Sequence, residues 1–403
     1  MIVRQFLLWA RTATPGQRAE ALGALARAYL YSDLSPEDRR EAETAMTALL
    51  DDPSPLVRGV LAETFANATD APRHIIVALV NDQVDIAARV LSRSPVLSDS
   101  DLVDCAALGD DLIQTAIALR PRVSISVAAA LAEIGSPGAL AALAGNDGAE
   151  IAQLSLGRMV SRHGGHAALR EALLSRPDLP LHIRQAVAVA VAQSLSSFVL
   201  DCGWLSPERT ERVVREAKDK TTVALSSDAD REDVARLVAH LRQSGQLTPS
   251  LILRAILSRA LLFVEAAFAD LSGLPPQKVS GLLWDRRGAG FAPLFRRAGL
   301  PESLRSAFDA ALAALGDLEG EATSGGAQLS RRMIERVLSA CEALPAEEAG
   351  KLMALLRRYE SEAAREEARQ LAGALADEAA LATILAHEPE ALIDRSYGAV
   401  IAA

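Results

Sequence analysis

The chain has few cysteines, few aromatic residues and no strong export signal. Its three cysteines, Cys105, Cys202 and Cys341, lie far apart among 403 residues and form neither a CxxC pair nor an even set for a disulfide framework. This favours a reducing compartment, so we expect a cytoplasmic location. Phe, Trp and Tyr make up only 4% of the chain, which disfavours an aromatic-rich β-sandwich.

Apolar runs long enough to cross a membrane are also lacking. The most apolar stretch, residues 186–200, is interrupted by Gln193 and three serines. It is shorter than the roughly 20 residues that a membrane-spanning helix needs. We therefore expect a buried helix here and no membrane association.

Positive charge is not in excess. Lys and Arg total 42 against 52 Asp and Glu, which gives a net charge of −10. Such a balance disfavours attraction of the whole molecule to nucleic acid or anionic lipid. By segment, the net charge is −5 for residues 1–195, +2 for 196–316 and −7 for 317–403, so an anion-binding face is expected in the middle segment if anywhere.

What the chain does have is helix-forming residues in a repeating pattern. Ala, Leu and Val supply most of the hydrophobic half of the sequence, and this composition favours closely packed helices. Between about residues 45 and 195, a short polar turn repeatedly precedes an apolar helix. The steps between successive turns are 30, 28, 37 and 31 residues when the following aspartates mark them: Asp52, Asp82, Asp110, Asp147 and Asp178.

This spacing fits two short antiparallel helices and their turns. We expect each turn aspartate to cap the free N–H groups of the next helix, and an arginine recurs near the same place in two of these helices, as Arg58 and Arg89. Neither helix of a pair can bury its apolar stripe alone, so stacked pairs would form an α-solenoid with an extended binding surface. The alternative is an irregular helical bundle with accidental turn spacing.

The remainder of the chain divides into three further segments, all expected to be helical or linking. Ser206-Pro207 and Thr248-Pro249 are typical helix starts, with a polar cap and Pro in the first turn. The predicted organisation is helical repeats in residues 1–195, a second helical region in 196–316, an acidic glycine-rich linker in 317–329 and a helical C-terminal tail in 330–403. The fold class expected is all-α.

Three stretches of the chain resemble a known family. They are Asp-Pro-Ser-Pro-Leu-Val-Arg at 52–58, Leu-Thr-Pro-Ser-Leu at 247–251 and the run from Phe291 to Pro301. Together they are similar to the bacterial domain-of-unknown-function family 2336, over most of the chain and ending near the acidic linker. The resemblance implies a HEAT-like helical fold and a bacterial origin, and it carries over no catalytic residue.

No catalytic, cofactor-binding or metal-binding residue is predicted. His163 and His166 are the nearest approach to a metal pair, but zinc needs three or four protein ligands, and a turn between helices explains them better. Gly288 and Gly290 begin like a nucleotide-binding loop but lack the third glycine and a preceding strand. The aspartate pairs of the repeat turns are explained by helix capping.

One cluster predicts a partner-binding surface. Arginine and aromatic residues together favour recognition, and here they gather in a chain that is otherwise poor in aromatics. The alternative is that the aromatic residues belong to the core and the arginines are merely solvated. The cluster comprises Trp284, Arg286, Arg287, Phe291, Phe295, Arg296 and Arg297.

The leading functional hypothesis is a non-catalytic scaffold that binds another protein through its helical repeats. It follows from repeat architecture without visible chemistry. A nucleic-acid-binding repeat protein is the second hypothesis, but the net charge of −5 in residues 1–195 opposes it. A third is a small-ligand sensor or enzyme whose site is assembled from residues distant in sequence.

Overall fold

The protein is built from α-helices in a computed structural model that describes residues 2–285, 290–318, 326–341 and 346–387. Within these ranges there are twenty-two α-helices, two short 3-10 helices and no β-strand, which confirms the all-α prediction. A single parallel bridge joins Val123 to Ala149. The chain divides into two compact units, residues 1–218 (unit 1) and 219–403 (unit 2).

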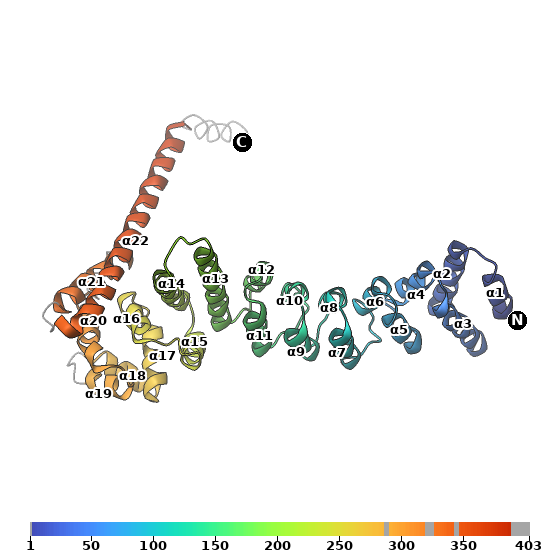
Figure 1. Ribbon diagram of the computed structural model, residues 1–403, viewed down its shortest axis with the longest axis horizontal. Helices are drawn as coiled ribbons and strands as arrows, with labels where there is room; N and C mark the ends of the chain where they lie inside the picture. The colour runs from blue at the N-terminus through green and yellow to red at the C-terminus, as the bar shows by residue number, and fades with distance from the viewer. Residues whose placement is uncertain (1, 286–289, 319–325, 342–345, 388–403) are drawn as a thin grey trace, which may run out of the picture. The chain divides into compact units, whose positions relative to one another are not determined.

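Unit 1 holds thirteen helices and part of a fourteenth, many of them only two or three turns long (Figure 1). A 3-10 helix, η1 (Leu49–Asp51), lies between α3 and α4. The α-helices are α1 (Ile2–Ala10), α2 (Pro15–Tyr31), α3 (Pro36–Ala48), α4 (Pro55–Phe65), α5 (Arg73–Val80), α6 (Val84–Leu91), α7 (Asp99–Leu108), α8 (Asp111–Ala118), α9 (Ile125–Ile134), α10 (Pro137–Ala144), α11 (Gln153–His163), α12 (Ala167–Ser175), α13 (Leu181–Asp201) and α14 (Pro207–Ser227), which runs into unit 2.

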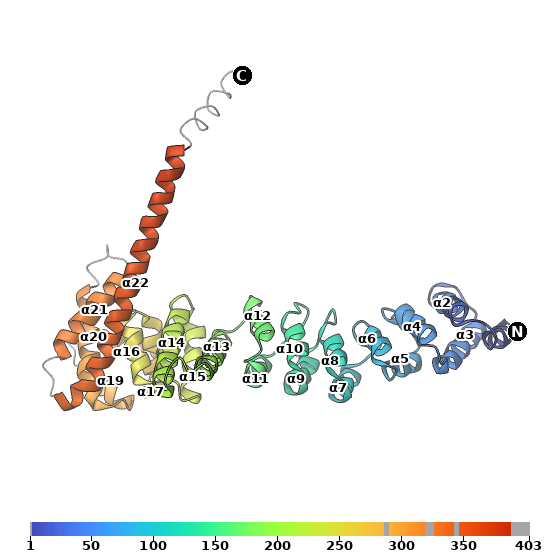
Figure 2. The same cartoon turned by 45° about the horizontal axis from the view of Figure 1, so that its top comes forward.

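The helices of unit 1 lie in two rows, as Figures 1 and 2 both show. In one row α2, α4, α6, α8, α10 and α12 pack on one another in succession. In the other row α1 packs on α3, and α7, α9, α11 and α13 pack in succession. Helix α5 packs on α4, α6 and η1, without a comparable contact to α7, so the second row is interrupted there.

Polar side chains start these helices as the sequence pattern predicts. Thr14 precedes Pro15 and forms a reciprocal capping box with Gln17 at the start of α2. Asp110 accepts a hydrogen bond from the backbone N–H of Ile113 at 3.0 Å and so caps α8. Caps of this kind satisfy N–H groups that have no partner within the helix.

The other four turn aspartates do not cap the next helix, contrary to our expectation: α4, α6, α11 and α13, which follow Asp52, Asp82, Asp147 and Asp178, begin without a side-chain cap. Arg18 donates to Asp52 through both Nε and Nη2, at 2.7 and 2.9 Å, and Arg58 donates to Asp82 in the same way, at 2.6 and 2.8 Å. Arg58 also donates to the backbone oxygen of Asp52 at 2.6 Å. The planar guanidinium matches a carboxylate in this two-bond geometry, so each arginine links its own helix to the turn of the following repeat.

Helix α13 is the one helix among the described residues that is long and apolar enough to cross a membrane by length and composition. The expectation of a buried helix is corrected, because only Ile183, Gln185 and Val187 are buried in it. Its later turns leave Leu195 and Phe198 more than half exposed. Phe198 forms an edge-to-face pair with Trp204, at 5.6 Å between ring centroids.

Unit 2 is organised around aromatic side chains. Phe263, Phe268, Phe295 and Phe308 are fully buried, and the last three form a network of ring contacts with Phe291. The helices that carry and surround them are α15 (Arg231–Gln243), α16 (Pro249–Leu257), α17 (Leu261–Ser272), α18 (Pro276–Leu283), α19 (Phe291–Arg297), η2 (Glu302–Leu304), α20 (Arg305–Leu318), α21 (Gly326–Cys341) and α22 (Ala346–His387).

The helical tail expected in residues 330–403 contains α22, which packs on α21 within unit 2. Leu352, Leu356 and Tyr359 are buried, whereas Leu371 and Leu375 farther along the helix are exposed because the helix continues past its neighbours (Figure 2). The first part of the tail is therefore docked within unit 2. Most of the predicted linker, 317–329, lies outside the described residues. The predicted boundary between the helical repeats and the second helical region, at residue 195, falls within α13.

Candidate functional site

The sequence-predicted partner cluster turns mainly inward. The Nε1–H of Trp284 donates to Glu265 at 2.9 Å, and Ser280 and Arg231 donate to the same carboxylate at 2.8 and 2.9 Å. Burial alone would raise the pKa of Glu265, but these hydrogen bonds outweigh it and hold the pKa below its ordinary value. Trp284 thus supplies one of the hydrogen bonds that the nearly buried carboxylate of Glu265, in α17, requires.

The other described members of the cluster are also mostly structural. Phe291 and Phe295 are buried in the aromatic core. The Nε of Arg297 donates to the backbone oxygen of Ser272 at 2.8 Å, near the end of α17, and Arg296 is exposed. Arg286 and Arg287 lie outside the described residues. Within the described part of the chain, the cluster therefore presents Arg296, Arg297 and part of the half-buried Trp284 to solvent.

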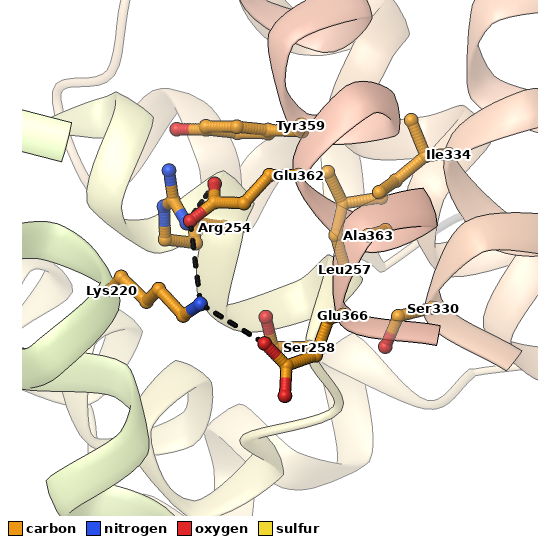
Figure 3. Close-up of a pocket in the computed structure, with 10 residues that line it drawn as sticks. All are labelled: Lys220, Arg254, Leu257, Ser258, Ser330, Ile334, Tyr359, Glu362, Ala363 and Glu366. Atoms are coloured by element: carbon orange, nitrogen blue, oxygen red, sulfur yellow. Dashed lines mark hydrogen bonds and ion pairs between the residues drawn. The ribbon is translucent and has the colours of Figure 1, made fainter. Parts of the chain in front are cut away.

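A different arginine holds the C-terminal helix in place (Figure 3). Arg254 of α16 is only 6% exposed, and its guanidinium lies under the ring of Tyr359, 4.2 Å from the centroid. It donates to Glu362 of α22 at 2.9 Å, while the hydroxyl of Tyr359 donates to the backbone oxygen of Ser250 at 3.3 Å. An ion pair, a cation–π contact and a hydrogen bond thus fasten α22 to α16.

Lys220 completes this joint from α14. Its Nζ lies 3.8 Å from Glu362 and 3.4 Å from Glu366, so two cations face two carboxylates (Figure 3). Burial raises the pKa of Tyr359 to about 12, so its hydroxyl stays protonated at neutral pH and serves as a donor, not as a base. The pocket beside these residues is only about 140 Å³. This arrangement suits a structural fastening better than a reaction centre.

A larger cavity lies in unit 1, at the interruption of the second row. It has a volume of about 530 Å³ and is lined by residues of α5, α6, α7 and the turns that follow them, and by Ile113 of α8. We call it the α5–α7 groove. Its lining residues are Val77, Val80, Asn81, Asp82, Val84, Leu91, Leu97, Asp101, Asp104, Cys105, Leu108, Gly109, Asp110 and Ile113.

The groove combines exposed apolar side chains with carboxylates. Leu108 is 92% exposed and Val77 is 39% exposed, and both stand at its edge. Four aspartates line the groove, and no lysine or arginine does so among the described residues. An apolar lining with a few placed charges is typical of binding sites, and sequence patterns give no local signal for it because it depends on which helices fail to stack.

The other chemically interesting residues lie in ordinary positions. His163 ends α11 and His166 precedes α12, as the predicted turn requires, and the backbone N–H of His166 donates to the oxygen of His163 at 2.8 Å. The described residues contain no group of three or more potential metal ligands. Cys105 lines the groove, and burial, reinforced by nearby aspartates, raises the pKa of its thiol, which disfavours the reactive thiolate.

The structure also shows how one site residue could have been found from sequence. Arg254 interrupts a run of six apolar residues, Leu251–Leu257, all of which are buried. A charge in such a run must be paired, so a partner carboxylate or aromatic ring could have been expected. The identity of that partner, more than one hundred residues later in the chain, has no local signature.

Comparison with known proteins identifies a family match. Residues 86–347 match the family described as an uncharacterised protein conserved in bacteria, DUF2336. The match begins within α6 and ends at the start of α22, so it includes the side of the groove formed by α7, and it extends beyond the linker where the sequence resemblance was expected to end. No curated protein and no solved structure matches the chain. Because the family match covers more than half of the chain, the protein belongs to the DUF2336 family of bacteria.

Proposed function

We propose that this protein is a non-catalytic scaffold that binds another protein, and that unit 1 is a HEAT-like α-solenoid. The successive stacking of its helices and the arginine links between neighbouring repeats support this architecture. A cytoplasmic location is consistent with the three free cysteines. The acidic charge of residues 1–195 weighs against binding to nucleic acid phosphates.

The α5–α7 groove is the observation that carries the proposal. Soluble proteins expose single apolar residues freely, but here exposed Leu108 and Val77 border a cavity whose walls are largely apolar. Stacked helical repeats bury their faces against their neighbours, so the sparse packing between α5 and α7, which the Arg73–Asp101 ion pair bridges, leaves apolar area that a partner can cover. Covering that area would give a binding free energy without any chemical step.

Affinity purification of the full-length chain from native bacterial extract tests the proposal. The unaltered protein is compared with Leu108→Asp, which changes the groove, and with Leu154→Asp, which changes an equally exposed leucine on α11 outside it. We expect one protein in stoichiometric amount with the unaltered chain and with Leu154→Asp, and its loss with Leu108→Asp. Recovery of nucleic acid alone, or of no partner by the unaltered chain, would contradict the scaffold function.

A further inference from the structure

We propose that the α5–α7 groove accepts a partner-protein segment that carries both apolar and basic side chains. This inference rests on the proposed scaffold function and adds the chemistry of the partner. It follows from the size of the groove, from the exposed apolar residues at its edge and from the charge of its lining.

The size of the groove suits a segment of polypeptide. Its volume of about 530 Å³ lies within the range of about 300–1,000 Å³ that is usual for binding pockets. The deep wall is formed by buried Leu91 and Leu97 and the edge by Leu108, so a few apolar side chains of a partner would be covered from several sides. An amphipathic helix presents such side chains three or four residues apart.

The charge of the groove determines which charged side chains the bound segment should carry. Asp82 is already paired with Arg58, and Asp101 is paired with Arg73 at 2.8 Å. Asp104 is exposed on α7 and has no ion pair among the described residues, and Asp110 is engaged only as a helix cap. Two carboxylates without a neighbouring cation therefore favour Lys or Arg in the partner and disfavour acidic segments and phosphates.

The binding experiment uses three fluorescent 18-residue helical peptides with the same spacing of apolar and charged positions. One combines Leu with Lys, the second Leu with Glu and the third Ser with Lys. Anisotropy titrations with the full-length protein give the Kd for each peptide. We expect only the Leu/Lys peptide to bind, because it alone satisfies both the apolar wall and the carboxylates, and we expect its Kd to rise with salt.

Matched variants locate the binding. Leu108→Asp and Asp104→Lys should each weaken the Leu/Lys peptide by at least about tenfold. Two control variants change unit 1 away from the groove: Leu154→Asp replaces an exposed leucine, and Glu171→Lys reverses an exposed charge. Both should leave the Kd unchanged. Equal weakening by all four variants would show non-specific attraction to an acidic protein and would overturn the inference.

Two other outcomes separate the inference from the proposed function. If the unaltered chain captures a protein from extract but the peptide data show no dependence on Leu108, the scaffold function stands and the partner chemistry is wrong. If sedimentation velocity shows a dimer that Leu108→Asp dissociates, the groove is occupied by a second copy of this chain, and the inferred partner is likewise wrong. Stronger binding of the Leu/Glu peptide would also contradict it.

Discussion

The two units bury their apolar residues in different ways. Unit 1 uses mainly Ala, Leu, Val and Ile between short helices, with Tyr29 and Phe65 as its buried aromatics, and it links neighbouring repeats through arginines. Unit 2 gathers phenylalanines into one core and fastens α22 through Arg254. Stability in stacked repeats comes from nearest neighbours, whereas a single core is shared by all its helices. A change should therefore act locally in unit 1 and throughout unit 2.

The largest effect is expected for Phe295→Ala. Phe295 is fully buried and contacts both Phe291 and Phe308, so its removal leaves a cavity in the shared core. The free energy of unfolding of unit 2 should fall by about 3–5 kcal/mol. Denaturant unfolding, with hydrogen exchange reporting on each unit separately, measures this change. A loss below about 1 kcal/mol would place Phe295 outside the core and return it to the predicted partner surface.

Arg254→Ala should destabilise unit 2 by about 3 kcal/mol, because it leaves the carboxylate of Glu362 and the ring of Tyr359 without their buried partner. Amide exchange should increase along α22 around these residues. Lys220→Met removes a half-exposed cation from the same joint and should cost less than about 1 kcal/mol. Similar costs for the two variants would show that burial of Arg254 does not set the strength of the fastening.

Arg58→Ala tests whether a change in unit 1 acts only on the neighbouring helices. It removes charged hydrogen bonds to Asp82 and to the turn oxygen of Asp52, which should cost about 1.5–3 kcal/mol. The loss of exchange protection should be confined to α4, α6 and the turns between them. Uniform loss across α2 to α12 would contradict stabilisation by nearest neighbours.

The smallest expected effect is the acid sensitivity of unit 1. Hydrogen bonds from Arg18 and Arg58 lower the pKa values of Asp52 and Asp82. A lowered carboxyl pKa adds stability that is fully present above the unfolded pKa of about 4 and is lost as pH falls through the folded value. Stability should thus be flat from neutral pH down to about pH 5 and fall below about pH 4.

Asp82→Asn is the matched variant for this pH dependence. It should be less stable at neutral pH and show a shallower decline in acid, because one of the titrating groups is absent. Circular dichroism of thermal unfolding at a series of pH values provides the measurement. A decline as steep as that of the unaltered protein would mean that the Arg58–Asp82 pair does not contribute to acid sensitivity.

The sequence predicts the helices better than it predicts their contacts. Proline and capping residues mark the starts of α2 and α16 because these signals are local: Thr14 caps the former and Thr248 the latter. The turn aspartates mark the repeats, but the partners of Asp52 and Asp82 lie one repeat earlier in the chain, in α2 and α4, and local capping rules do not predict them.

The candidate site shows the same limit. Trp284 and Phe295 are aromatic residues, which suit either a binding surface or a core, and only the fold decides between the two. The groove depends on how weakly α5 and α7 pack beyond the Arg73–Asp101 ion pair, which no motif encodes. Leu108, 92% exposed at the end of α7, has the sequence context of any other helical leucine.

Photo-crosslinking in living bacteria tests the central claim most directly. A photoreactive amino acid replaces Leu108 at the groove or, in a matched strain, Leu154 outside it, in the full-length chain. We predict a single crosslinked protein at position 108 and none of it at position 154, with a basic and apolar segment at the site of attachment. No protein crosslink at position 108, or the same products at both positions, would contradict the groove as the place where this scaffold binds its partner.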